Sequence, residues 1–81
     1  MKAIVNIYLK EGVLDPQGKA VHHALESLGF KEVQDVRVGK QIILTLSDNL
    51  DVDEAKKEVE EMCEKLLANT VIEDYEIEIV Q

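Results

Sequence analysis

Apolar and polar side chains alternate at both ends of the chain, and this two-residue period is typical of a half-buried β-strand. The odd positions between residues 3 and 9 are all apolar. Between residues 71 and 79, apolar or aromatic side chains alternate with Asp74, Glu76 and Glu78. We therefore predict a first strand over residues 3–9 and a last strand over residues 71–79. The acidic face of the last strand should meet solvent or a basic partner.

Two segments instead repeat apolar residues every three or four positions, which indicates amphipathic helices. In the first, Asp15 suits the N-cap, Pro16 suits the first helical position, and Gly29 suits a left-handed residue after the helix. In the second, Asp51 and Glu54 form a start that resembles a capping box. The apolar stripes are formed by Ala20, Val21, Ala24, Leu25 and Leu28, and by Val52, Ala55, Val59, Met62, Leu66 and Leu67.

The middle segment, residues 32–47, leaves two alternatives open. A hairpin with a three-residue loop would pair Val38 with Ile42, and a single strand bent at Gly39 would also keep its apolar side chains on one face. A continuous strand of fifteen residues would measure ~50 Å, whereas a compact domain of this length has a radius of gyration of only ~12 Å. Such a strand would have to enter another subunit. The element order is therefore β-α-β-(β)-α-β, in an oligomer that could exchange segments.

With 81 residues, the chain is expected to form a single domain, 1–81, with a small interior. Domains of this size often need disulfides, a metal or a partner subunit. Cys63 is the only cysteine, which excludes an intrachain disulfide and favours a reducing cytoplasm; we expect it to be a small buried hydrophobe. The neighbouring His22 and His23 would diverge by ~100° on a helix, so we expect no metal site. Association with other subunits is therefore the remaining way to stabilise so small a domain.

The net charge of −8 is concentrated in the second part of the chain, because residues 48–81 hold twelve Asp and Glu against three Lys. Such a chain would be repelled by phosphodiester backbones, and its three aromatic residues offer few stacking platforms for bases. No apolar stretch approaches the ~20 residues that a membrane-spanning helix needs. We therefore expect a cytoplasmic protein that binds neither nucleic acid nor membranes.

The pair Gly18-Lys19 invites comparison with a phosphate-binding P-loop, but the rest of that motif is missing. A P-loop needs an earlier glycine and a hydroxyl residue after the lysine, whereas Ala20 follows here. Asp15 would also place a negative charge beside the phosphate. The segment is better explained as a helix start, in which Gly18 indicates close approach of another backbone or of a partner.

Four segments carry a resemblance to a known family: Asp15-Pro16-Gln17-Gly18-Lys19-Ala20, Leu28-Gly29-Phe30, Val36-Arg37-x-Gly39-Lys40, and Cys63-x-x-Leu66-Leu67-x-Asn69. Together they resemble the PurS family, the small subunit of phosphoribosylformylglycinamidine synthase, over essentially the whole chain. The resemblance implies an α+β, ferredoxin-like β-α-β-β-α-β domain whose antiparallel sheet carries two helices on one face. It also implies intertwined dimers or tetramers.

The resemblance further implies a function in de novo purine biosynthesis. The small subunit would bridge a glutaminase subunit and a larger synthetase subunit, so that ammonia from glutamine converts formylglycinamide ribonucleotide to the amidine. ATP and magnesium would be used by the synthetase subunit, and this chain would bind no cofactor.

Reasoning from the residues alone agrees that the chain is not an enzyme by itself. It has no second cysteine, no serine beside a histidine, and no metal ligands at usable spacing. We therefore predict no catalytic, cofactor or metal residues. The resemblance and the exposed turn positions favour a group of contacts with a partner or a second protomer: Asp15, Gln17, Gly18, Lys19, Arg37, Gly39 and Lys40.

A second hypothesis comes from a different class of protein. The same element order permits a stand-alone regulatory module that binds a small effector between paired ferredoxin-like domains, because one fold hosts many functions. The lack of a glycine-rich loop between the first strand and the first helix counts against it.

Overall fold

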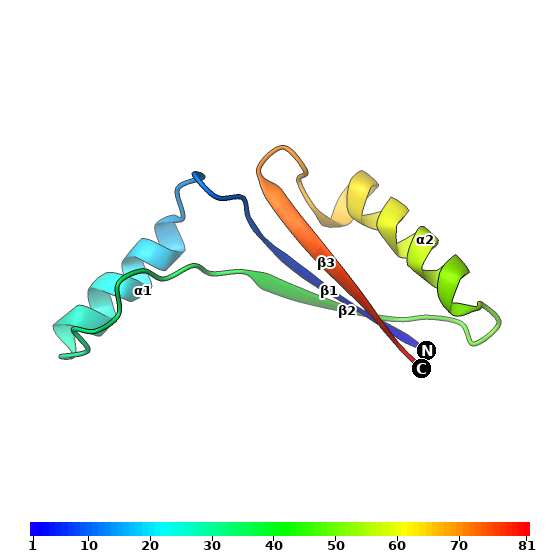
Figure 1. The fold of residues 1–81 in the computed structure, drawn as a ribbon, viewed down its shortest axis with the longest axis horizontal. Helices are drawn as coiled ribbons and strands as arrows, with labels where there is room; N and C mark the ends of the chain where they lie inside the picture. Colours follow the sequence, from blue (N-terminus) through cyan, green and yellow to red (C-terminus); the bar gives the residue numbers. More distant parts are fainter.

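The computed structural model describes residues 1–81 as three strands and two α-helices, with a single turn of π-helix after the second (Figure 1). The strands form one antiparallel sheet in the order β2-β1-β3. The predicted α+β class is confirmed. The elements are β1 (Lys2–Leu9), α1 (Pro16–Ser27), β2 (Lys40–Thr45), α2 (Val52–Met62), η1 (Cys63–Leu67) and β3 (Glu73–Val80).

The core lies between the sheet and α2. Alternation in β1 directs Ala3, Val5 and Ile7 to one face, where they pack with Val59 and Cys63 and are almost fully buried. Asp51 accepts a hydrogen bond from the backbone N–H of Glu54 at 2.8 Å, so α2 begins at the predicted N-cap. Burial raises the pKa of the Cys63 thiol, which keeps it neutral. The cysteine is thus a small buried hydrophobe, as predicted.

The middle segment contains no hairpin. Residues 33–39 run without a turn into β2, and the chain follows one course from the turn after α1 to the far side of the sheet (Figure 1). The sheet therefore has three strands, whereas the ferredoxin-like order predicts four. The extended course also makes the molecule 51 Å long and raises its radius of gyration to 16.2 Å.

The position of α1 also differs from the prediction. Both helices were expected on one face of the sheet. Within one chain only α2 covers that face, and α1 projects beyond the end of the sheet at which β1 finishes (Figure 1). The two connections of α1 lead away from the sheet, which prevents the helix from folding back. Its apolar stripe is consequently open, and Leu28 is 73% exposed. We call residues 19–35 the arm.

We predict that Val59→Ala lowers the free energy of unfolding by ~2 kcal/mol, because it removes two methyl groups from a fully buried site. Denaturant unfolding at one fixed protein concentration measures this loss. The matched control is Val71→Ala, since Val71 is 81% exposed; it should change the free energy by less than ~0.5 kcal/mol. Equal losses for the two variants would show that the core is placed incorrectly.

Candidate functional site: the neck

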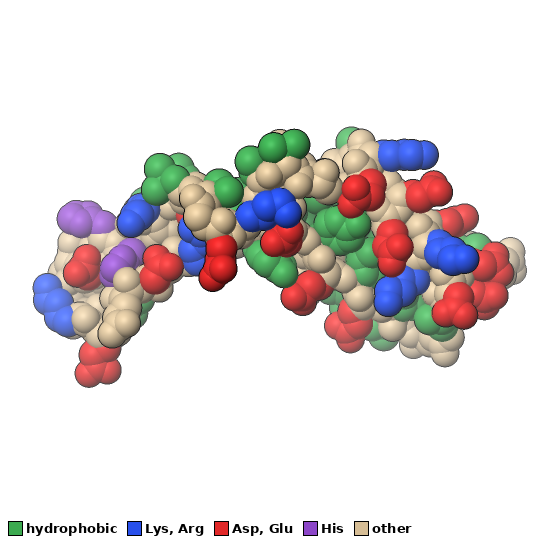
Figure 2. Space-filling view, turned by 45° about the horizontal axis from the view of Figure 1, so that its top comes forward, with side chains coloured by type: hydrophobic (Ala, Val, Ile, Leu, Met, Phe, Trp, Pro, Cys, Tyr) green, Lys and Arg blue, Asp and Glu red, His purple; other side chains and the backbone are tan.

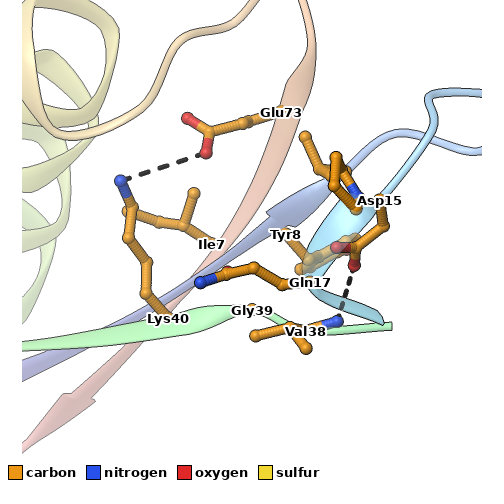
Figure 3. A pocket seen from close by; sticks show the side chains of 10 residues that line it. Ile7, Tyr8, Asp15, Gln17, Val38, Gly39, Lys40 and Glu73 are labelled. Carbon is orange, nitrogen blue, oxygen red and sulfur yellow. Dashed lines mark hydrogen bonds and ion pairs between the residues drawn. The ribbon is translucent and has the colours of Figure 1, made fainter. Parts of the chain in front are cut away.

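Six of the seven predicted contact residues lie where the chain leaves the sheet for α1 or returns from it. We call this region, residues 10–18 and 36–40, the neck; Lys19 lies next to it. Figure 3 shows Asp15 and Gln17 beside the returning residues Val38, Gly39 and Lys40. Residues far apart in the sequence are thus brought together as a single group.

Asp15 is the centre of the neck. It is only 5% exposed, and its two carboxylate oxygens accept hydrogen bonds from different segments. Oδ1 accepts from the backbone N–H of Gly18 at 2.8 Å, which makes Asp15 the predicted N-cap of α1. Oδ2 accepts from the backbone N–H of Val38 at 2.7 Å. One side chain therefore ties the start of α1 to the returning segment.

These contacts also set the charge state of Asp15. The N–H groups of Val38 and Gly18 lower the pKa of this carboxyl below its ordinary value of 3.8, and the positive charge of Arg37 acts in the same direction against the effect of burial. Asp15 is thus ionised at neutral pH.

Arg37 makes the second tie across the neck. Its Nη1 donates to the carbonyl of Val13 at 2.9 Å, and Nη2 donates to the carbonyl of Lys10 at 3.2 Å. Both acceptors belong to the connection that leaves the sheet, whereas Arg37 belongs to the segment that returns. The guanidinium thereby satisfies two loop carbonyls and fixes the distance between the two connections.

Two glycines allow the backbones to approach closely. A Cβ on Gly18 would lie 2.1 Å from the carbonyl oxygen of Val36, and one on Gly39 would lie 2.8 Å from that of Ile7. Neither position has room for a side chain. The close approach predicted from Gly18 is therefore confirmed, and the neck is a rigid crossing of two backbones.

A shallow hollow of about 320 Å³ lies on each side of Asp15. Gln17 and Lys40 line the first, in which Lys40 Nζ lies 3.9 Å from a Glu73 carboxylate oxygen (Figure 3). Lys19 and Arg37 line the second. Gln17 and Lys19 make no side-chain hydrogen bond or ion pair within the chain, so their polar groups are available to another molecule.

Sequence reasoning missed an apolar groove of about 550 Å³ between β2 and the end of α2. Leu44, Met62, Leu66 and Leu67 line it, and Leu66 is 82% exposed. The sequence carried no clear signal for it, because residues ~100° apart fit on one broad apolar helix face, and Leu66 and Leu67 both belong to the predicted stripe. The neck and this groove offer surfaces for contact, and no cluster of His, Cys, Asp or Glu in the structure could hold a metal ion.

No helix in the structure combines the length and the apolar character that crossing a bilayer requires.

Comparison with known proteins gives one consistent result. The family model "PurS: Phosphoribosylformylglycinamidine (FGAM) synthase" matches residues 2–81. The PurS subunit of phosphoribosylformylglycinamidine synthase from Bacillus subtilis strain 168 is 58% identical over 79 residues, which cover 96% of this chain and 90% of the relative. The corresponding subunit from Methanocaldococcus jannaschii is 49% identical and covers 96% and 93%.

Solved structures agree in fold as well as in sequence. The crystal structure of Methanocaldococcus jannaschii PurS has a TM-score of 0.89 at 48% identity and covers 99% of this chain and 95% of that one. A chain in the structure of PurLQS from Thermotoga maritima has a TM-score of 0.86 at 29% identity, with coverages of 98% and 95%. The extended middle segment and the separate arm therefore belong to a fold that these structures share. This chain is a member of the PurS family.

Proposed function

We propose that this chain is the small, non-catalytic subunit of phosphoribosylformylglycinamidine synthase, and that it joins a glutaminase subunit to an ATP-dependent synthetase subunit in the cytoplasm. Its full-length similarity to the chain in the Thermotoga maritima PurLQS structure carries this proposal. The residues 1–81 would act as one domain. ATP and magnesium would be used by the synthetase subunit, with no cofactor bound to this chain.

The benefit of a bridging subunit is proximity. Ammonia released into bulk water is diluted and largely protonated, whereas ammonia released beside the synthetase reaches its acceptor at a high effective concentration. A bridge needs exposed contacts and rigidity, and it needs no reacting groups. The neck fits this role, because its backbones are fixed while Gln17 and Lys19 remain available for contact with a partner or a second protomer.

A second copy of the chain is the first partner that the proposal requires. The apolar stripe of α1 has no sheet to cover in its own chain, and the groove at Leu44, Met62 and Leu66 has no helix to fill it. The α1 of one copy would lie in the groove of the other. Residues 33–39 would then pair with the free edge of the other copy's β2 as a fourth strand.

The free edge of β2 has the hydrogen-bonding groups that this pairing needs. Leu46 donates its backbone N–H to Met1, and the register continues through Ala3 opposite Leu44, so alternate residues of β2 bond to β1. Gln41, Ile43 and Thr45 therefore direct their N–H and C=O groups outward. The exchange would restore four strands with two helices on one face, in a homodimer or in a tetramer of two such dimers.

We predict that Asp15→Ala speeds amide hydrogen exchange at Gly18 and Val38 about tenfold at pH 7, because each amide loses a charge-assisted hydrogen bond. Amides in β1 should keep their rates. The pKa of Asp15 is lowered in the folded chain, so its stabilisation is present above the ordinary value of 3.8 and is lost as the pH falls through the lowered one. The control, Asp35→Ala on the returning segment that carries Val38, should leave both amides unchanged. Equal exchange in the two variants would contradict the assigned role of Asp15.

We predict that Val21→Asp in the α1 stripe, and likewise Leu66→Asp in the groove, weakens association of the chain with itself at least a hundredfold, ~3 kcal/mol, because each places a charge in an apolar contact. Light scattering over a dilution series measures this. The control is His23→Asp, which adds an acid on the opposite side of α1. If all three variants keep the wild-type mass, the exchanged dimer is wrong.

We predict that the two larger subunits without this chain use ammonia but lose most glutamine-dependent synthesis, on the order of a hundredfold, because ammonia from the glutaminase is then lost to bulk water. Steady-state assays with either nitrogen source measure this, and adding back the chain should restore the glutamine reaction. Equal glutamine-dependent rates with and without the chain would overturn the proposed function.

The alternative hypothesis, a stand-alone regulatory module, is tested by equilibrium dialysis of the isolated chain against amino acids and purine intermediates. A ligand bound in stoichiometric amount would favour that module.

A further inference from the structure

The sheet has a second free edge, along β3, that the exchanged dimer does not use. Lys10 donates its backbone N–H to Ile72 at 2.8 Å, and the register places Tyr8 opposite Asp74 and Ile4 opposite Glu78. Residues 74, 76, 78 and 80 therefore bond to β1. Tyr75, Ile77 and Ile79 direct their backbone N–H and C=O groups away from the sheet, where no group of the chain pairs with them.

The two faces beside this edge differ in chemistry. Toward α2, the half-buried side chains of Tyr75, Ile77 and Ile79 pack against the core. The opposite face of β3 carries three successive acids, Asp74, Glu76 and Glu78, about 7 Å apart. Figure 2 shows acidic side chains gathered over the half of the molecule that holds α2 and β3.

The acids of β3 are only partly satisfied within the chain. Lys10 forms an ion pair with Asp74 at 2.6 Å, and the hydroxyl of Tyr8 donates to Glu76 at 3.2 Å. Glu78 has no ion pair or side-chain hydrogen bond and is exposed. We call Asp74, Glu76 and Glu78 the acidic strip. Most of its negative charge is therefore left to interact with solvent or with a partner.

Charge decides which kind of strand this edge can accept. If two β3 edges paired, the acids of both copies would meet on one face, and like charges on paired strands destabilise a sheet. The β2 edge has no such obstacle, because Gln41, Ile43 and Thr45 occupy the corresponding face. Copies of this chain should therefore associate through β2 and avoid β3.

We propose that the β3 edge binds an extended segment of one of the two larger synthase subunits, with Lys or Arg at alternate positions and apolar residues between them. The segment would add a strand to the sheet through the outward groups of Tyr75, Ile77 and Ile79. Its basic side chains would face the acids, and its apolar side chains would extend the core-side face. This inference rests on the proposed function and identifies the surface that carries it.

The first test reverses the charge of the acidic strip on β3. Glu76→Lys together with Glu78→Lys should weaken binding to at least one of the purified synthetase and glutaminase subunits tenfold or more, while the dimer mass stays unchanged. The matched control, Glu26→Lys with Glu32→Lys, makes the same change in charge on the arm and should bind like wild type. If the β3 variant binds both subunits like wild type, or only gains self-association, the acids merely protect the edge and the proposal is overturned.

The second test detects the added strand without a substitution. Amide hydrogen exchange of the wild-type chain, with and without each larger subunit, should show new protection of at least tenfold at Tyr75, Ile77 and Ile79. Exchange at those amides that stays unchanged in the complex overturns strand addition, even where charge reversal weakens binding. Restoration of glutamine-dependent synthesis by the wild-type chain is measured separately, so the β3 proposal can fail while the bridging function stands.

Discussion

The crossing of two backbones at the neck determines the rest of the structure. The carboxylate of Asp15 accepts hydrogen bonds from the backbone N–H groups of Gly18 and Val38. The absence of side chains at Gly18 and Gly39 lets the backbones pack closely, which fixes the direction in which both segments leave the sheet. The first helix is therefore held away from the sheet that its apolar stripe would otherwise cover. Only nine of 81 residues are buried as a result, which is a small interior even for a short chain. The constraint that shapes the arm therefore also leaves the apolar stripe of α1 uncovered within the chain.

Two unlike edges follow from this arrangement. A three-stranded sheet with β1 at its centre leaves β2 and β3 open, and open edges promote association unless charge prevents it. The β2 edge, whose outward residues Gln41, Ile43 and Thr45 carry no charge, lies beside the apolar groove, so one second copy could supply both the pairing strand and the docking helix. The acidic β3 strand forms the opposite edge of the sheet. In the proposed assembly, the charge on alternate residues would separate self-association from association with other proteins.

Much of this fold could be predicted because local rules agree with it. Alternation located β1, and the caps at Asp15 and Asp51 located the starts of both helices. β3 begins at Glu73, two residues later than predicted, because the carbonyl of Asn69 accepts from Ile72 and Glu73 and closes a turn. The π-helical turn η1 could not be predicted; it contains Leu66, which is 82% exposed and lines the groove.

The middle segment shows where the sequence pattern stops being informative. Val36, Val38, Ile42 and Leu44 share one parity, so a hairpin and a continuous strand bury the same side chains. Periodicity records that a side chain is covered, and it does not record which copy of the chain covers it. The same limit applies to the neck. The motifs around Asp15 and Gly18 were recognisable, whereas the crossing that gives both residues a structural role depends on contacts distant in sequence, such as the hydrogen bond between Val38 and Asp15, 23 residues apart.

In the proposed dimer, rigidity and symmetry together explain how so small a chain can organise larger ones. The exchanged strands would join two sheets at their β2 edges, which leaves a β3 edge at each outer end. Each partner segment held at such an edge would be fixed relative to the necks by a continuous, hydrogen-bonded sheet, which deforms less than a flexible linker. The effective concentration of one enzyme near another depends on such fixed geometry. A non-catalytic subunit can therefore control a reaction through the separation of its edges, without a reactive group of its own.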